Sequence, residues 1–174
     1  PIRYLNEMGV INNRTLLIHC NYVSDEEVAI IQSSGANVAF CPGSHRFFGH
    51  TNHPVRRYLD AGINVAIGTD SLASNDSLSV LDELKYLSAN HTLSPQTLIS
   101  MATVNGAKAI GLESQVGQLR EGFAADICGV GLPEHHANAR TMSENGDIYQ
   151  RLFSQASKNV FTMVAGVVCY NAAT

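Results

Sequence analysis

The sequence predicts an α/β fold in which short parallel strands alternate with helices. Apolar runs at residues 15–20, 37–41 and 64–68 are continuous rather than alternating, which is typical of strands buried on both faces of a parallel sheet. Helical patterns separate these runs, and this βα rhythm places the chain in the α/β class.

The helix after the first strand is marked at both ends. Ser24 can cap its start, Glu27 completes a capping box with Ser24, and Gly35 ends it. The second strand ends at Pro42, and we expect a loop rich in glycine and histidine from Gly43 to His53.

Three further helices are expected before residue 112. The first runs from Pro54 to Ala61 and is followed by Gly62, which is the usual order of proline and glycine at helix ends. The second covers 78–89, and the third is capped by Ser94 and continues to about residue 110. The second carries leucines at helical spacing on one face: Leu78, Leu81, Leu84 and Leu87.

The pattern becomes β-rich after residue 111. We therefore expect one unit at residues 1–111 and a second at 112–174, the second with a helical insert. In the second unit the sequence predicts a turn and strand at 117–127, then a polar loop at 133–145 and a helix near 148–155. Two closing strands, at 160–164 and 167–170, are expected to flank a hairpin turn at Ala165-Gly166.

Composition excludes several classes of partner. The 174 residues carry a net charge of −4 and the longest basic cluster is Arg56-Arg57, so the sequence argues against a nucleic-acid partner. No apolar run reaches the roughly 20 residues that cross a bilayer, so no membrane partner is expected.

The four cysteines form no C-x-x-C pair, which argues against a zinc-ribbon or thioredoxin-like site. We expect Cys20, Cys41 and Cys169 to be small buried hydrophobes of a reducing, cytoplasmic protein.

Polar residues that could take part in catalysis or metal binding lie at or just after the ends of the predicted strands. His19 ends the first strand, Asp70 follows the third, and Ser44 and His45 lie just beyond the second. The carboxyl ends of parallel strands meet at one edge of a sheet, so His19 and Asp70 are expected at a common mouth where they can serve a divalent metal.

Each of these residues also has a plain structural interpretation. His19 can be a hydrogen-bonded core histidine, and Asp70 can be a turn or capping residue beside Thr69. His50 and, more so, His53 fit a solvated loop, and the pair His135-His136 fits an exposed polar loop.

An ordered set of motifs resembles the amidohydrolase superfamily, and within it the branch of cytosine deaminases, chlorohydrolases and deaminases of adenosine derivatives. Their order, rather than any one of them, makes the resemblance specific. The motifs are Ile18–Cys20, Ser24–Glu27, Phe40–His45, Gly68–Asn75, the G-x-L-x-x-G-x-x-A-D run at Gly117–Asp126, and the closing strands.

The resemblance implies a fold and residue roles. The family fold is an eight-stranded (β/α)8 TIM barrel with a small β-sandwich, and this chain corresponds to about strands six to eight plus a C-terminal segment of the sandwich. By motif, Asp70 is implied as the metal ligand and proton shuttle, and His19 as the strand-six histidine that contacts water or substrate. Ser44, His45 and Asn75 lie in segments that resemble substrate-binding loops; His45 departs from the asparagine common in these deaminases.

The implied activity is metal-dependent hydrolysis of non-peptide C–N bonds. A metal-bound hydroxide would deaminate an amino-substituted heterocycle or nucleoside-like small molecule, with zinc as the expected metal and iron or manganese as alternatives. A chlorohydrolase or amide hydrolase using the same site is an alternative, as is a non-catalytic domain that assembles with a partner.

The sequence lacks the family's H-x-H pair and its strand-five histidine. We therefore expect the C-terminal part of a longer enzyme, inactive without an N-terminal part in the same or a companion chain. We also expect a homo-oligomer.

Overall fold

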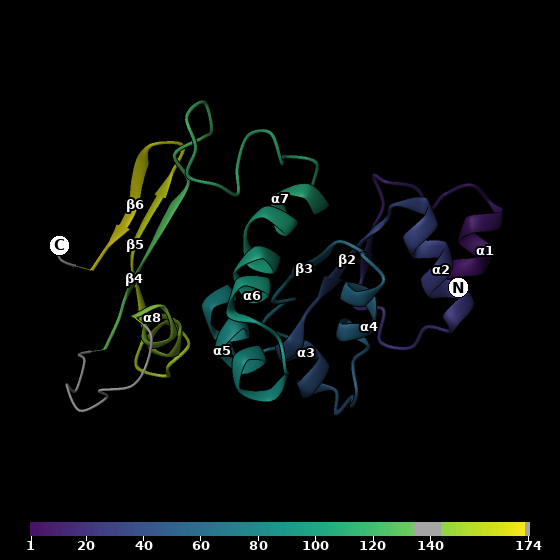
Figure 1. The fold of residues 1–174 in the computed structure, drawn as a ribbon, viewed down its shortest axis with the longest axis horizontal. Helices are drawn as coiled ribbons and strands as arrows, with labels where there is room; N and C mark the ends of the chain where they lie inside the picture. Colours follow the sequence, from purple (N-terminus) through teal and green to yellow (C-terminus); the bar gives the residue numbers. More distant parts are fainter. Residues whose placement is uncertain (134–143, 173–174) are drawn as a thin grey trace.

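The computed structural model describes residues 1–133 and 144–172; His135 and His136 lie outside these ranges (Figure 1). The helices are α1 (Ile2–Glu7), α2 (Asp25–Ser34), α3 (Pro42–Phe47), α4 (Val55–Asp60), α5 (Val80–Asn90), α6 (Pro95–Ala102), α7 (Val104–Ala109) and α8 (Glu144–Leu152). The strands are β1 (Leu16–Ile18), β2 (Asn37–Phe40), β3 (Val65–Ile67), β4 (Ile127–Gly131), β5 (Lys158–Val164) and β6 (Val167–Asn171). None of the described helices combines the length and apolar character needed to cross a membrane.

The first three strands form the predicted parallel sheet, in the order β1-β2-β3. All of β2 is buried, as expected for the central strand. In contrast, β1 is partly exposed, and the side chain of Ile18 is 52% exposed. Both β1 and β3 are edge strands of the sheet as it is built from the described residues, but α6 and α7 pack against β3, whereas the main contacts of β1 are with β2.

The predicted boundaries of α2 are confirmed. The Ser24 hydroxyl accepts a hydrogen bond from the backbone N–H of Glu27, and the Glu27 carboxylate accepts one from the backbone N–H of Ser24, so the capping box is complete. At the other end Gly35 adopts the left-handed backbone, with φ of 70°.

The loop expected from Gly43 to His53 is partly wrong, because its first residues form the helix α3. Pro42 occupies the first helical turn, where its fixed φ favours a helix and its missing N–H costs nothing. The proline that ends the second strand therefore also starts a helix, which stops before Gly49 at φ of 67°.

The single helix expected to run to residue 110 is instead two helices, α6 and α7, broken at Thr103. Thr103 has φ of −128° and ψ of −93°, outside helical values. The break lets the Asn105 amide nitrogen donate to the carbonyl of Val65, while the Asn64 amide nitrogen donates to the carbonyl of Asn105. These bonds attach α7 to the strand β3.

The leucine stripe predicted on α5 is only partly correct. The helix begins at Val80 with Ser79 as its cap, so Leu78 precedes it and is 58% exposed. Leu84 and Leu87 are buried as expected.

The last three strands form an antiparallel sheet in the order β4-β5-β6. The predicted hairpin between β5 and β6 is confirmed, since Ala165 and Gly166 both have positive φ. The expected burial of Cys169 is wrong because it lies on an exposed strand, whereas Cys41 is buried and Cys20 is partly buried. In Figure 1 this sheet and α8 lie beside α5, at the opposite end of the molecule from α1 and α2.

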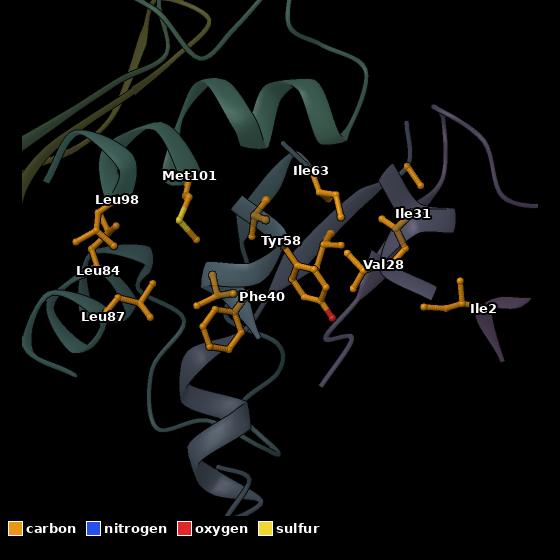
Figure 2. Packing of buried hydrophobic residues seen from close by; sticks show 14 of the residues in the cluster. Ile2, Val28, Ile31, Phe40, Tyr58, Ile63, Leu84, Leu87, Leu98 and Met101 are labelled. Atoms are coloured by element: carbon orange, nitrogen blue, oxygen red, sulfur yellow. The ribbon is translucent and has the colours of Figure 1, made fainter. Parts of the chain in front are cut away.

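One apolar cluster joins the helices to the parallel sheet (Figure 2). It extends from Leu84 and Leu98 on one side, past Phe40, to Ile31 on the other. His53, expected in a solvated loop, is only 7% exposed and stacks on Phe40 with ring centroids 3.6 Å apart. That expectation is wrong because His53 folds inward over the end of β2.

Candidate active site

Two polar side chains meet at the carboxyl end of the parallel sheet. His19 follows β1 and Asp70 follows β3, and His19 Nε2 lies 3.6 Å from Asp70 Oδ2. The two side chains are 37% and 34% exposed. Each side chain is therefore packed against the protein over most of its surface, and the rest is accessible to a small molecule.

The backbone at these strand ends is unusual. His19 and Asp70 have φ of 66° and 61°, in the left-handed region that residues with a Cβ seldom adopt. Such strain persists only where surrounding contacts impose it, and it concentrates at functional sites.

Three hydrogen bonds hold the Asp70 carboxylate. Ser44 Oγ donates to Oδ2 at 2.8 Å, Ser74 Oγ donates to the same oxygen at 3.0 Å, and the backbone N–H of Ser71 donates to Oδ1 at 3.0 Å. The bond from Ser44, with those from Ser74 and Ser71, lowers the pKa of Asp70. The side chain is therefore a fixed, ionised carboxylate.

His45 lies beside this pair, on α3. Its Nδ1 lies 3.0 Å from the amide oxygen of Asn21, which can only accept, so Nδ1 carries the proton and Nε2 is an acceptor. Burial lowers the pKa of His45, which keeps the ring neutral. A cavity of about 290 Å³ opens here, and its lining is His19, Asn21, Ser44, His45, Phe48 and His50.

Asn75 is placed differently from the other predicted site residues. Its side chain is buried, and its amide nitrogen donates to the carbonyl of Thr69 at 2.7 Å and to Oε1 of Glu83 at 2.5 Å. Its amide thus supports the backbone that leads into Asp70, and it does not line the cavity beside His19.

Sequence reasoning missed Glu83. This buried carboxylate also accepts a hydrogen bond from the backbone N–H of Gly43 at 2.7 Å, so it ties α5 to both α3 and the Asn75 loop. Burial raises the pKa of Glu83. Its position in the sequence gave a signal, since an acidic residue four places before the buried Leu87 lies on the apolar face of the helix.

The donor set fits one side of a metal site. The Asp70 carboxylate supplies an oxygen, which zinc accepts as a ligand, and the His19 imidazole beside it can hold a water molecule at the metal. Within residues 1–133 and 144–172, no cluster of three or more histidine, cysteine, aspartate or glutamate side chains is arranged to hold a metal ion. A tetrahedral site built on Asp70 would therefore need ligands from beyond the described residues.

Comparison with known proteins gives consistent matches. The model of the amidohydrolase family matches residues 1–169. A 5-methylthioadenosine/S-adenosylhomocysteine deaminase of Pyrococcus abyssi is 32% identical over 174 residues, which covers 95% of this chain and 40% of the relative. The enzyme of the same name from Pyrococcus furiosus is 38% identical over 144 residues, 78% of this chain and 34% of the relative.

Solved structures agree with the sequence comparison. A zinc-bound adenosine deaminase from Xanthomonas campestris superposes with a TM-score of 0.83 at 25% identity, over 98% of this chain and 40% of that one. A variant of atrazine chlorohydrolase from Arthrobacter aurescens, complexed with zinc and atraton, gives a TM-score of 0.84 at 28% identity, over 98% of this chain and 39% of that one. The chain thus spans about two fifths of the length of these structures. From its sequence and its fold, the chain belongs to the amidohydrolase family.

Proposed function

We propose that this chain supplies part of the active site of a metal-dependent hydrolase that deaminates an amino-substituted heterocycle or a nucleoside-like compound. The observation that carries the proposal is the Asp70 carboxylate, held by three hydrogen bonds beside His19 at the end of the parallel sheet. Relatives named as deaminases of adenosine derivatives support this class of substrate.

In this proposal residues 1–111 are the part of a (β/α)8 barrel around strands six to eight, and residues 112–174 belong to an accessory β-sandwich. The remaining barrel strands and metal ligands come from a further segment, in the same or a companion polypeptide. The share of the relatives that the chain spans, 40% of the Pyrococcus abyssi enzyme, supports this arrangement.

Each residue has a distinct task in the proposed reaction. Asp70 would be one ligand of a divalent metal, with zinc favoured by the zinc-bound relatives, and the metal would supply Lewis-acid activation of water. The Asp70 carboxylate takes a proton from the attacking water and returns it to the departing nitrogen, so that ammonia leaves. His19 orients the attacking water from the other side of the pair.

The cavity residues bind the substrate. Ser44 fixes the Asp70 carboxylate and also faces the cavity, and the free Nε2 of His45 can accept a hydrogen bond from an amino group on the ring. Phe48 offers an apolar surface against which a planar ring can lie.

Dechlorination is the second candidate, because the atrazine chlorohydrolase variant superposes as well as the adenosine deaminase does. The same water activation would then expel chloride in place of ammonia. Parallel assays of ammonia release from adenosine derivatives and chloride release from chlorotriazines distinguish the two.

The decisive experiment uses Asp70→Ala in the complete enzyme, with Asp76→Ala as its control. Asp76 lies six residues away with its side chain 86% exposed, and it pairs with Arg46 instead. Asp70→Ala should lose metal on dialysis and lose turnover by about 10²-fold or more, whereas Asp76→Ala should keep both. Retention of metal and turnover by Asp70→Ala would remove Asp70 from the mechanism.

A further inference from the structure

The chain leaves β1 through two successive residues in the left-handed region. His19 has φ of 66° and Cys20 has φ of 50°, and both carry a Cβ. A single residue of this kind is already unfavourable, so two in a row require contacts that hold them. The side chain of His19 is aimed by this stretch of backbone.

Buried donors clamp both residues. His53 Nε2 lies 2.7 Å from the carbonyl oxygen of His19, and the Tyr58 hydroxyl donates to the carbonyl oxygen of Cys20 at 2.6 Å. His53 precedes α4 and Tyr58 lies within it. In Figure 2 the ring of Tyr58 lies in the apolar cluster near Phe40, with its hydroxyl at the margin of the cluster.

The chemistry of His53 indicates why an imidazole is there. A carbonyl oxygen can only accept, so Nε2 of His53 carries the proton and Nδ1 is left with a bare lone pair. That Nδ1 is buried and has no hydrogen-bond partner. A phenyl ring would fill the same space over Phe40 without leaving an acceptor unpaired, so the imidazole is useful here for its N–H donor.

The His53 ring is uncharged at neutral pH. Burial lowers the pKa of His53 to about 4, and the neighbouring imidazoles of His45 and His91 act in the same direction. The ring therefore stays neutral while it holds His19.

We propose that His53 and Tyr58 are positioning residues that hold the left-handed turn after β1 and thereby keep the His19 imidazole beside the Asp70 carboxylate. The proposal rests on the proposed function only for what His19 does in the reaction; the clamp itself is a property of the fold.

The test compares matched variants of the complete enzyme. His53→Phe keeps the ring stacked on Phe40 but removes the donor, whereas His53→Gln places an amide N–H at a similar reach. Tyr58→Phe removes only the hydroxyl that donates to Cys20, and Tyr170→Phe on exposed β6 is a control of the same chemistry. Each variant is measured for kcat and KM, for melting temperature at pH 7.5, and by crystallography for the position of His19.

His53→Phe should lower kcat by about 10- to 100-fold with KM changed less than about threefold. Its melting temperature should stay within about 4 °C of the parent, because the lost hydrogen bond is offset by removal of a buried unpaired acceptor. His19 Nε2 should move away from Asp70 by about 1 Å or more. His53→Gln should recover most of kcat, and Tyr170→Phe should match the parent.

Other outcomes also decide the matter. An unmoved His19 in His53→Phe, or a His53→Gln variant no better than His53→Phe, overturns the clamp. If His53→Phe does not fold, Tyr58→Phe carries the test: a displaced turn with lowered kcat supports the clamp, and an unchanged turn overturns it. If the parent releases neither ammonia nor chloride, the proposed function fails, but the position of His19 in the variant crystals still supports or refutes the clamp.

Discussion

Ser44 Oγ lies 2.8 Å from Oδ2 of Asp70, so the first turn of α3 holds the carboxylate that follows β3. Ser74 adds a second bond to the same oxygen from the loop on the other side. These hydroxyls lower the pKa of Asp70 and fix its direction. If Asp70 binds the metal as proposed, loss of a group that orients it in this way typically costs about 10- to 100-fold in metal affinity or activity.

Ser44→Ala should therefore reduce metal affinity or turnover of the complete enzyme by about 10-fold or more. Ser71→Ala is the matched control, because Ser71 donates to Asp70 through its backbone N–H, which the substitution retains. Metal content after dialysis against a chelator and steady-state kcat are the measurements. Equal values for the two variants would show that the Ser44 hydroxyl does not support the carboxylate.

Gly43 is expected to tolerate no side chain. A Cβ at this position would lie 2.4 Å from Asn75 Oδ1, inside a buried hydrogen-bonded group. Gly43→Ala should lower the free energy of unfolding by about 1–3 kcal/mol. Gly106→Ala in α7 is the control: its Cβ meets nothing closer than 3.9 Å, and helix propensity favours alanine by about 1 kcal/mol. Urea unfolding of both variants gives the comparison, and equal effects would contradict the steric argument.

Asn75 and Glu83 form a buried donor–acceptor pair, in which the Asn75 amide nitrogen donates a hydrogen bond to the Glu83 carboxylate. Asn75→Asp would place a second carboxylate against the buried Glu83 and remove the bond to Thr69. We expect a loss of about 3 kcal/mol or more in the free energy of unfolding. Adding Glu83→Gln should recover part of this loss, because the glutamine amide can donate to the new carboxylate. A double variant as unstable as the single one would contradict this pairing.

Much of the fold is predictable from the sequence because its signals are local. The capping box of Ser24 and Glu27, the glycine at 35 and the turn at Ala165-Gly166 act within a few residues, and each is found where the sequence predicts it. The adjacency of His19 and Asp70 is also predictable, because the topology of a parallel sheet brings strand ends together.

The features that sequence reasoning missed depend on distant partners. Glu83 contacts Gly43 across 40 positions in the chain, and His53 contacts His19 across 34. The helix break at Thr103 accompanies the contact of Asn105 with Val65, again across 40 positions. No local pattern carries such information, so the sequence assigns no role to Glu83, fits His53 to a solvated loop and predicts one continuous helix across Thr103.

If these 174 residues are produced alone, without the further segment proposed above, we expect them to self-associate. β1 and β3 are the edges of the described parallel sheet, and edge strands offer unpaired backbone groups to other chains. Apolar side chains also lie exposed on β1 and on the hairpin, among them Ile18, Val164, Val167 and Val168. Light scattering over a range of concentrations should report aggregates or oligomers, and a stable compact monomer would contradict this expectation.

The buried His53 predicts how stability depends on pH. In the unfolded chain this imidazole takes up a proton as the pH falls through about 6.5, its ordinary pKa, whereas burial lowers the pKa in the folded state to about 4. Between these values the unfolded state binds more protons, so the free energy of unfolding falls as the pH falls. The loss from this group is about 2 kcal/mol at pH 5 and about 3 kcal/mol at pH 4, and it levels off at about 3.4 kcal/mol below pH 4.

His53→Phe removes this titration while keeping the ring in place. Between pH 7.5 and pH 5 the parent should therefore lose about 2 kcal/mol more of its free energy of unfolding than the variant does. His45 and His91, whose pKa values are also lowered by burial, titrate in both proteins, so most of their contribution cancels in the difference. Urea unfolding of the two proteins at both pH values measures this difference in the free energy of unfolding. Parallel pH dependences would mean that His53 is not the buried, neutral donor that holds the His19 carbonyl.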